Sequence, residues 1–490
     1  MYLNTTKYKC LKGKYLKLIR EYKLKKYNFL ILLILIFLTS TTSSVKSISR
    51  NYSECDEIDY TEQILANSYS FDNFTHFVEI YNSVDISEKA TVLEEYISWQ
   101  ESSGGGFPAI QNDTYVVFIY YNPSLALDEC GITGDFTAYN IRTMTQLDLD
   151  VSFFFYECLF EPTSRINYFF VVEDEWILDD RNPLTSPAGF DWPASELAMP
   201  EFVQPEEIMY RENITHGQLS TLEDPWTNPV VQVYLPPNYD SGRLYSVVYT
   251  GDGSSYTSLM SMVNILDNLI ADRRISPVII VFIDPLDFVV GEPYDYLKRV
   301  DWYKCNPDYL EYLEGLVDYI DTTYSTNTSS YARCHLGLSI SGLVSTYVAL
   351  ERPNLFKLFA SQSGSFSIGQ DFYQIKTKYE LAYESLNLKA WFSIGTYENN
   401  NNFGTPMVED TEEMADICAS KGWTTRLVYN VGECHIYGQW RHCLDDMLEF
   451  FFPYEEYQET DETIMKISIL ILPIILFAIV LKRRKLLKFK

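Results

Sequence analysis

A serine within a run of small residues is the first candidate for chemistry in this sequence. Ser339 lies in Gly337-Leu-Ser-Ile-Ser-Gly342, between an apolar stretch that ends at Leu336 and a helical pattern over 343–351. A tight turn from strand to helix can expose a serine hydroxyl for attack on an ester, and small neighbours prevent clashes there. The usual Gly-x-Ser-x-Gly pattern has Ser341 at its last position here, so a serine-rich turn without catalytic function is the alternative interpretation.

Serine attack needs a general base, and the chain has only five histidines. They are His76, His216, His335, His435 and His442. His435 directly follows an apolar run, on a loop from which an imidazole could reach Ser339, whereas His442 is expected inside the last helix. A solvated loop histidine is the alternative interpretation, but the order serine, acid, histidine is a known triad arrangement. We therefore predict His435 as the general base.

A carboxylate is needed to orient the imidazole and to stabilise its charged form. Glu398 follows the apolar run 390–394 and is the predicted acid, although Glu409 and Asp410 lie nearby and Glu398 could be a surface charge. The oxyanion that forms on attack needs backbone N–H donors. We predict that these come from Ile340, directly after the serine, and from Ser254, at the end of Tyr249-Thr-Gly-Asp-Gly-Ser254.

These residues lie among compact apolar runs that alternate with helical patterns. The runs are 230–235, 245–249, 278–283, 332–338, 390–394 and 427–431, and the helical patterns are 259–271, 309–324, 343–351 and 407–421. Buried strands that alternate with helices indicate a mostly parallel sheet covered on both faces. We therefore predict an α/β domain over residues 228–452. The chain has 490 residues, and single cores stop growing near roughly 250–300 residues, so a second folded unit is expected.

The second unit is predicted upstream. Residues 111–184 contain short aromatic and β-branched runs separated by turn residues, which is typical of a small all-β sandwich. Residues 51–110 have mixed helical and loop character and form an N-terminal extension without an assigned role. Residues 185–227 are rich in proline and acidic residues and are a predicted linker.

The motifs of the α/β domain resemble those of the enterochelin esterase family, within the larger esterase D-like group. They are Gly337–Leu343, Ser361–Ser365, Gly395–Glu398, His435 with Trp440-Arg441, Gly251–Gly253, Val281–Asp284, Arg299 and Cys305–Asp308. The resemblance implies an α/β-hydrolase fold that cleaves carboxylic esters without a metal or an organic cofactor. It implies Ser339 as nucleophile, His435 as base and Glu398 as acid, with Arg299 and Trp440 in the substrate pocket.

The predicted sandwich resembles the N-terminal immunoglobulin-like domain of enterochelin esterases and of glycogen-binding modules. This resemblance rests on Gly134-Asp-Phe136, Met144, Tyr168–Val172, Trp176 and Asp179–Pro183. With the α/β domain, the similar region covers roughly residues 110–452. Two positions depart from the family patterns. In the sandwich, Tyr139 stands where the family usually has Trp, and in the α/β domain Trp302 stands where the family has an acidic residue three positions after Arg299. Aromatic residues of this kind belong more often to a core than to a sugar site.

The substrate is expected to be a small-molecule or glycan-linked ester. Enterochelin itself is not predicted, because its hydrolysis is cytoplasmic and acts on a strongly anionic complex. The chain carries a formal charge of −29 overall and −43 over residues 28–481. Such an acidic body argues against nucleic-acid binding. An inactive esterase-like ectodomain used for recognition or adhesion is the alternative function, and the sequence gives no prediction of the oligomeric state.

Two apolar segments predict the compartment. Within residues 1–50, the run Phe29–Leu38 follows a basic stretch and precedes small residues, which is typical of a signal peptide. Residues 464–481 follow an acidic stalk, 453–463, and are just long enough for a transmembrane helix. The basic tail 482–490 places that end in the cytoplasm. We therefore predict a single-pass type I membrane protein with a lumenal or extracellular body.

Two further patterns agree with this compartment. Eight cysteines lie in the predicted body, and their even number predicts disulfides, with Cys130 and Cys158 as the first expected pair. Asn-x-Ser/Thr triplets predict N-glycosylation at Asn51, Asn73, Asn112, Asn213 and Asn327.

Overall fold

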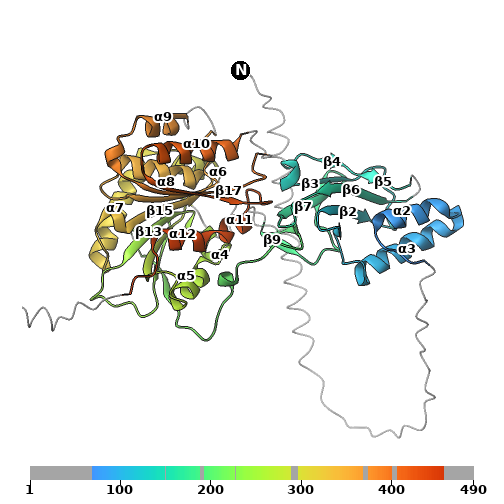
Figure 1. Cartoon of the computed structure of the whole chain (residues 1–490), viewed down its shortest axis with the longest axis horizontal. Coiled ribbons are helices and arrows are strands. Elements are labelled where there is room, and N and C mark those ends of the chain that lie inside the picture. Colours follow the sequence, from blue (N-terminus) through green and yellow to red (C-terminus); the bar gives the residue numbers. More distant parts are fainter. Residues whose placement is uncertain are drawn as a thin grey trace, which may run out of the picture. The chain divides into compact units, whose positions relative to one another are not determined.

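The first part of the fold is a helical hairpin against a small sheet. The computed structural model describes residues 69–148, 151–187, 193–223, 225–226, 228–287, 296–367, 373–399 and 405–456 (Figure 1). Helices α2 (Phe74–Ser83) and α3 (Ile86–Ser102) bury aromatic side chains against strand β6 (Phe153–Leu159). The rings of Phe77 and Tyr96 stack with centroids 3.9 Å apart. The predicted N-terminal extension therefore ends in a helical layer that covers one sheet face.

Two antiparallel sheets follow. The four-stranded sheet has the order β1-β2-β6-β5, and the six-stranded sheet has the order β4-β3-β7-β10-β9, with β8 paired to β7. Their bounds are β1 Ala109–Gln111, β2 Tyr115–Tyr121, β3 Gly131–Gly134, β4 Arg142–Thr143, β5 Thr145–Gln146, β7 Arg165–Val172, β8 Glu175–Ile177, β9 Thr185–Pro187 and β10 Pro193–Ala198. Aromatic side chains such as Phe118 and Tyr168 pack between the sheets, with ring centroids 4.8 Å apart.

The predicted linker is shorter than expected. Strands β9 and β10 lie within residues 185–227 and pair with the six-stranded sheet, and β11 (Gln218–Thr221) pairs with the next sheet. Ala194, Ser195 and Leu197 of β10 are buried, and the proline-rich composition of this segment concealed that burial. The prediction that all of 185–227 is a connector is therefore wrong at both ends.

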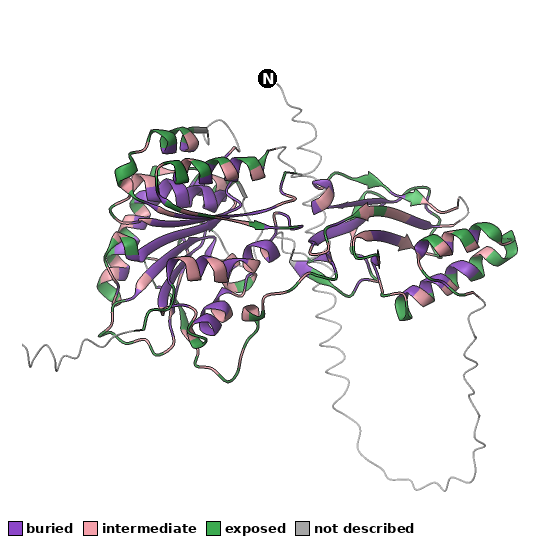
Figure 2. Cartoon of the chain, viewed as in Figure 1, coloured by how far each residue is buried: buried purple, intermediate pink, exposed green. Residues whose placement is uncertain are grey.

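The predicted α/β sheet is confirmed. Its eight strands have the order β11-β12-β14-β13-β15-β16-β17-β18, and every pairing from β14 to β18 is parallel. The bounds are β12 Val231–Leu235, β13 Ser246–Gly251, β14 Val278–Ile283, β15 Arg333–Leu338, β16 Leu358–Gln362, β17 Lys389–Gly395 and β18 Thr424–Asn430. All residues of β14 and β15 are buried, whereas the edge strand β18 is largely accessible (Figure 2).

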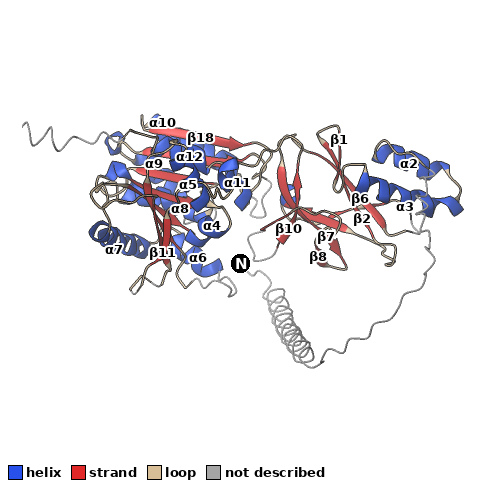
Figure 3. Ribbon diagram, turned by 90° about the horizontal axis from the view of Figure 1, so that it is seen from below, coloured by secondary structure: helices blue, strands red, loops and turns tan. Residues whose placement is uncertain are grey.

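Helices cover both faces of this sheet (Figures 1 and 3). One core contains residues of α6 (Tyr296–Tyr303), α7 (Pro307–Thr323), α8 (Ile340–Glu351), α9 (Tyr373–Leu381) and α10 (Met407–Ser420). The core on the other face contains residues of α4 (Gly253–Ser258), α5 (Met262–Ala271), α11 (Tyr437–His442) and α12 (Leu444–Phe451). Two-sided burial explains why the parallel strands are apolar throughout their length.

The cysteines correct one prediction. The seven cysteines of the described ranges are free thiols, and Cys130 and Cys158 are not bonded to each other. Cys130 precedes β3, and its sulfur lies 3.6 Å from that of Met144, whereas Cys158 lies in β6 of the other sheet. The two thiols therefore have different neighbours, which an even count of cysteines cannot reveal. Cys55 lies outside the described residues.

The predicted glycosylation positions differ in exposure. Asn112 and Asn213 are exposed. Asn73 is the N-cap of α2, with its side-chain oxygen accepting from the N–H of His76, and the side chain of Asn327 accepts from the N–H of Ser329. The first two positions are the more accessible, and glycosylation at all four stays a prediction. Asn51 lies outside the described residues.

The membrane predictions fall on other parts of the chain. Across the described ranges, every helix is too short or too polar to cross a bilayer. The predicted signal peptide, the apolar segment 464–481 and the tail 482–490 all lie outside the described residues.

Candidate active site

Ser339 lies at a sharp turn between β15 and α8. Its backbone has φ 54° and ψ −119°, a conformation that non-glycine residues rarely adopt. The Ser339 N–H donates to the carbonyl of Gln362 over 2.8 Å, which fixes the turn to the neighbouring strand. A side chain on Gly337 would meet the carbonyl oxygen of Ser341 at 2.1 Å. A glycine is therefore required at position 337, because the first turn of α8 approaches its backbone closely.

Ser339 and His435 form a hydrogen bond. The loop between β18 and α11 carries His435, and its Nε2 lies 3.0 Å from the Ser339 Oγ. The side chain of His435 is 24% exposed, so the imidazole is accessible from one side. An imidazole nitrogen at this distance can accept the serine proton.

Glu398 completes the chain of hydrogen bonds. Its Oε2 lies 2.7 Å from the His435 Nδ1, and its side chain has no exposed surface. Its Oε1 accepts the hydroxyl of Ser363 over 2.6 Å and the N–H of Gly395 over 2.8 Å. The carboxylate therefore has a fixed orientation, with one oxygen held by the protein and the other facing the imidazole.

Trp440 contacts both Ser363 and His435. Its indole N–H donates to the Oγ of Ser363 over 2.8 Å, and its ring meets that of His435 edge to face with centroids 4.8 Å apart. Trp440 is only 4% exposed. Its surroundings favour a role in orienting Glu398 and His435 over the expected direct contact with substrate.

The alternative acids lie elsewhere. Glu409 is exposed in the first turn of α10, and Asp410 forms an ion pair with Lys376 at 2.5 Å. Neither is bonded to His435, whereas Glu398 is. The structure thus brings together the three side chains that the sequence pattern singled out, from the carboxyl ends of β15, β17 and β18, where ligands bind in open α/β sheets.

Three of the other described histidines have partners outside the candidate site. His216 lies 2.9 Å from a carboxylate oxygen of Asp267, and His442 is bonded to Glu433, which raises the pKa of that imidazole. His335 is buried in β15, where its ring nitrogens form hydrogen bonds with the hydroxyls of Tyr309 and Ser345. Burial lowers the pKa of this imidazole to about 3.

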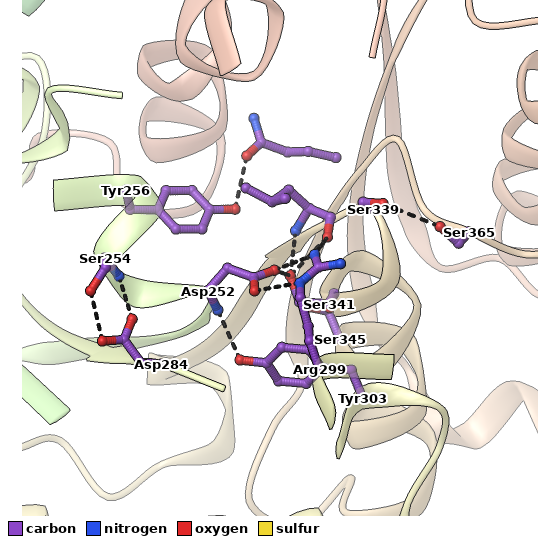
Figure 4. Close-up of polar contacts among 12 residues, drawn as sticks. Asp252, Ser254, Tyr256, Asp284, Arg299, Tyr303, Ser339, Ser341, Ser345 and Ser365 are labelled. Carbon is purple, nitrogen blue, oxygen red and sulfur yellow. Dashed lines mark hydrogen bonds and ion pairs between the residues drawn. The ribbon is translucent and has the colours of Figure 1, made fainter. Parts of the chain in front are cut away.

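The two predicted oxyanion donors have different surroundings. Ile340 is the first residue of α8, where the helix supplies no acceptor for the N–H groups. The N–H of Ser254 instead donates to Asp284 over 2.6 Å, as does its hydroxyl (Figure 4). Burial raises the pKa of Asp284 to about 6. The expectation that Ser254 offers a free N–H is therefore wrong, because a buried carboxylate already accepts it.

Arg299 is paired inside the protein. Its guanidinium donates to both oxygens of Asp252, over 2.7 and 2.6 Å, and its side chain is 8% exposed (Figure 4). Such a bidentate pair satisfies the charge of the arginine. Arg299 is thus held behind the serine turn, which favours a structural role over the expected direct contact with substrate.

Three contributors had no predicted role. Ser363, Ser365 and Asp252 all lie in motifs that carried the family resemblance, Ser361–Ser365 and Gly251–Gly253. The Ser365 Oγ lies 3.4 Å from that of Ser339, and its N–H donates to the Ser339 carbonyl. The motifs were the available signal, but which hydroxyl turns towards the triad depends on tertiary contacts. Within the described ranges, no set of three His, Cys, Asp or Glu side chains is arranged to hold a metal ion.

Comparisons with known proteins agree with this architecture. Residues 225–451 match the family model described as "Putative esterase". An endo-1,4-beta-xylanase/feruloyl esterase of Xylanibacter ruminicola is 25% identical over 259 residues, which are 50% of this chain and 32% of that protein. The uncharacterized protein YbbA of Bacillus subtilis is 25% identical over 210 residues, 39% of this chain and 78% of that protein. The chain thus spans about a third of the first relative.

Two solved structures have a fold similar to most of this chain. The enterobactin esterase of Shigella flexneri, in the presence of enterobactin, superposes with a TM-score of 0.58 and 17% identity, covering 72% of this chain and 97% of that one. The ferric enterobactin esterase of Salmonella typhimurium gives a TM-score of 0.55 and 14% identity, with 72% and 98% covered. At these identities the likeness concerns the fold.

Proposed function

Since residues 225–451 match the model of the esterase family, we propose that this protein is a serine carboxylic-ester hydrolase. Ser339 is the nucleophile, His435 is the general base, and Glu398 is the acid that orients the base. One observation carries the proposal. The Ser339 Oγ, both nitrogens of His435 and the Glu398 carboxylate form one continuous chain, with separations of 3.0 and 2.7 Å. This is the geometry in which a serine hydroxyl becomes a nucleophile.

The reaction follows from that geometry. The Ser339 Oγ attacks the ester carbonyl carbon while its proton moves to the His435 Nε2, and the N–H of Ile340 donates to the developing oxyanion. When the tetrahedral intermediate collapses, the imidazolium gives its proton to the leaving alcohol, and an acyl-enzyme remains. Water then attacks the acyl carbon with His435 again as base, which releases the acid and restores the serine. Glu398 keeps its charge throughout and stabilises the imidazolium.

The substrate class is a small-molecule or glycan-linked ester. A relative at 25% identity is described as an endo-1,4-beta-xylanase/feruloyl esterase, which supports an acyl group attached to a sugar. We infer that the two-sheet region before the α/β domain is an immunoglobulin-like domain, and such a domain is compatible with a glycan-linked ester.

The compartment belongs to the proposal as well. The apolar run Phe29–Leu38 follows the basic residues 1–27, and the apolar segment 464–481 precedes the basic tail 482–490. The predicted glycosylation sites lie between the two apolar segments. This pattern supports a type I membrane protein whose hydrolase domain lies in a lumen or outside the cell.

The test is the loss of activity and of labelling in Ser339→Ala. The full-length chain should hydrolyse short-chain p-nitrophenyl or acyl-sugar esters and should react with a serine-directed fluorophosphonate, and Ser339→Ala should do neither. Ser420→Ala is the matched control, because Ser420 is exposed at the end of α10 and should leave both readouts unchanged. A folded wild-type chain that is inert in both assays would favour the inactive ectodomain instead.

A further inference from the structure

Ser341 stands where the nucleophile pattern usually has its second glycine. We propose that Ser341 is a positioning residue, which holds the turn of the nucleophile in place through the buried pair of Asp252 and Arg299. The inference rests on the proposed function, because it concerns how Ser339 is presented for attack. It reverses the simplest interpretation of the sequence, in which a serine at this position crowds the turn and impairs the site.

The hydroxyl of Ser341 joins both sides of the turn. Its oxygen accepts the N–H of Leu338 over 2.9 Å and lies 2.8 Å from the carbonyl oxygen of the same residue. Leu338 directly precedes Ser339, and Ser341 is in the first turn of α8. The strand end and the helix start are therefore tied across the nucleophile by one side chain, an attachment that glycine cannot supply.

The same hydroxyl is anchored to a charged pair. Its oxygen lies 2.6 Å from the Oδ2 of Asp252, and a carboxylate can only accept, so the hydroxyl proton points to Asp252. The guanidinium of Arg299 holds both oxygens of that carboxylate, and the Tyr303 hydroxyl accepts the N–H of Asp252 over 2.9 Å (Figure 4). Asp252 is 5% exposed. Ser341 is thus attached to a charge-assisted network formed by Asp252, at the N-cap of α4, and by Arg299 and Tyr303 of α6.

The space for this side chain comes from a glycine across the turn. A side chain on Gly251 would meet the Cβ of Ser341 at 2.7 Å. The side chain of Ser341 therefore fits because Gly251, which faces it, has no side chain. Ser341 itself is fully buried and lies within a complete set of hydrogen bonds, which is the opposite of a crowded position.

The strained turn explains why a tether is needed. Ser339 has φ 54°, a backbone conformation that persists only when its surroundings hold it. Without the Ser341 hydroxyl, the Leu338 N–H and one oxygen of Asp252 each lose a partner inside the protein. The turn is then free to relax towards an unstrained conformation, which moves the Ser339 Oγ relative to the His435 Nε2.

The experiment compares Ser341→Ala and Ser341→Gly with the wild-type full-length chain. We expect kcat on a p-nitrophenyl ester to fall by about ten- to a hundredfold in both variants, since a shift of about 1 Å in a reacting group costs up to about a hundredfold. KM should change little, and the rate of fluorophosphonate labelling should fall in parallel with kcat. The melting temperature should also fall, because the buried Leu338 N–H loses its acceptor, so kcat of the folded protein is the deciding readout.

Thr346→Val is the matched control. Thr346 is also fully buried in α8, and its hydroxyl donates to the carbonyl of Leu343 within its own helix. This variant removes a buried hydroxyl without touching the turn, so it should keep kcat within about twofold of wild type. A purely structural role of Ser341 would lower the melting temperature of its variants and leave the kcat of the folded protein as in Thr346→Val.

A double-mutant cycle identifies the partner. Asp252→Asn replaces the charged acceptor by a neutral one and should lower kcat, and combining it with Ser341→Ala should cost less than the product of the two single effects, because both weaken the same hydrogen bond. Independent effects would overturn the proposal, as would a folded Ser341→Gly with kcat equal to or above wild type. In that last case the esterase function stands and only the positioning role fails, whereas an inert wild type refutes both.

Discussion

Replacing Glu398 by glutamine tests the proposed catalytic acid without changing the shape of the side chain. The carboxylate receives two donors at Oε1, the Ser363 hydroxyl and the Gly395 N–H, and faces the His435 Nδ1 with Oε2. A glutamine has one oxygen and one NH₂ group to place at these positions. If the NH₂ group faced the two donors, each would lose its acceptor in a buried site, at about 1–3 kcal/mol apiece.

The glutamine oxygen should therefore replace Oε1, and its NH₂ group should face the imidazole. A donor at that position can bond the His435 Nδ1 only when that nitrogen carries no proton, so the proton moves to Nε2. The Nε2 then presents an N–H to the Ser339 Oγ and cannot accept its proton. The wrong tautomer costs about 10⁴-fold in kcat in serine-protease triads, which corresponds to about 5 kcal/mol of transition-state stabilisation.

The assay is kcat of the purified full-length variant on a p-nitrophenyl ester, together with its melting temperature. Glu409→Gln is the matched control, because Glu409 is a nearby exposed acid in α10 and its neutralisation should leave kcat unchanged. A loss of less than about tenfold in folded Glu398→Gln would refute the reasoning and leave a Ser–His pair without an acid.

Two further predictions concern stability and topology. Burial lowers the pKa of His335 to about 3, and an unfolded histidine titrates near about 6.5, so only the unfolded state takes up this proton between those values. The free energy of unfolding should therefore fall as the pH falls through that window, and urea unfolding at about pH 7 and about pH 4 should show a smaller difference in His335→Gln than in wild type. An equal difference would contradict this account of His335. Protease added to sealed vesicles should remove only the tail 482–490 and leave a glycosylated body protected, and an unglycosylated, freely soluble chain would contradict the proposed topology.

The sequence by itself predicted the features that depend on local pattern. The alternation of apolar runs with helical patterns predicted a parallel sheet covered on both faces, because strands buried on both sides must be apolar throughout. The run of small residues around Ser339 predicted a strand-to-helix turn, since few other residues tolerate that approach. The position of His435 after the last strand predicted its proximity to Ser339, because parallel strands bring their carboxyl ends to one edge.

Tertiary structure decided the features that depend on partners distant in sequence. The N–H of Ser254 donates to Asp284, which lies 30 residues later in the chain. The residues around Ser254 therefore give no indication that this N–H already has an acceptor. The even number of cysteines predicted a disulfide between Cys130 and Cys158, but Cys130 precedes β3 of one sheet, Cys158 lies in β6 of the other, and their thiols are free. The burial of β10 was likewise concealed by a composition typical of a connector.

The last position of the nucleophile pattern shows the same division most clearly. From the sequence, Ser341 is a departure from glycine that could weaken the turn. Its acceptability depends on Gly251, on a strand 90 residues earlier, and its bonds depend on Asp252 and Arg299, which come from two other segments. A pattern of adjacent residues can identify which residue departs from it, but only the packed structure determines whether space and hydrogen-bond partners exist for the replacement.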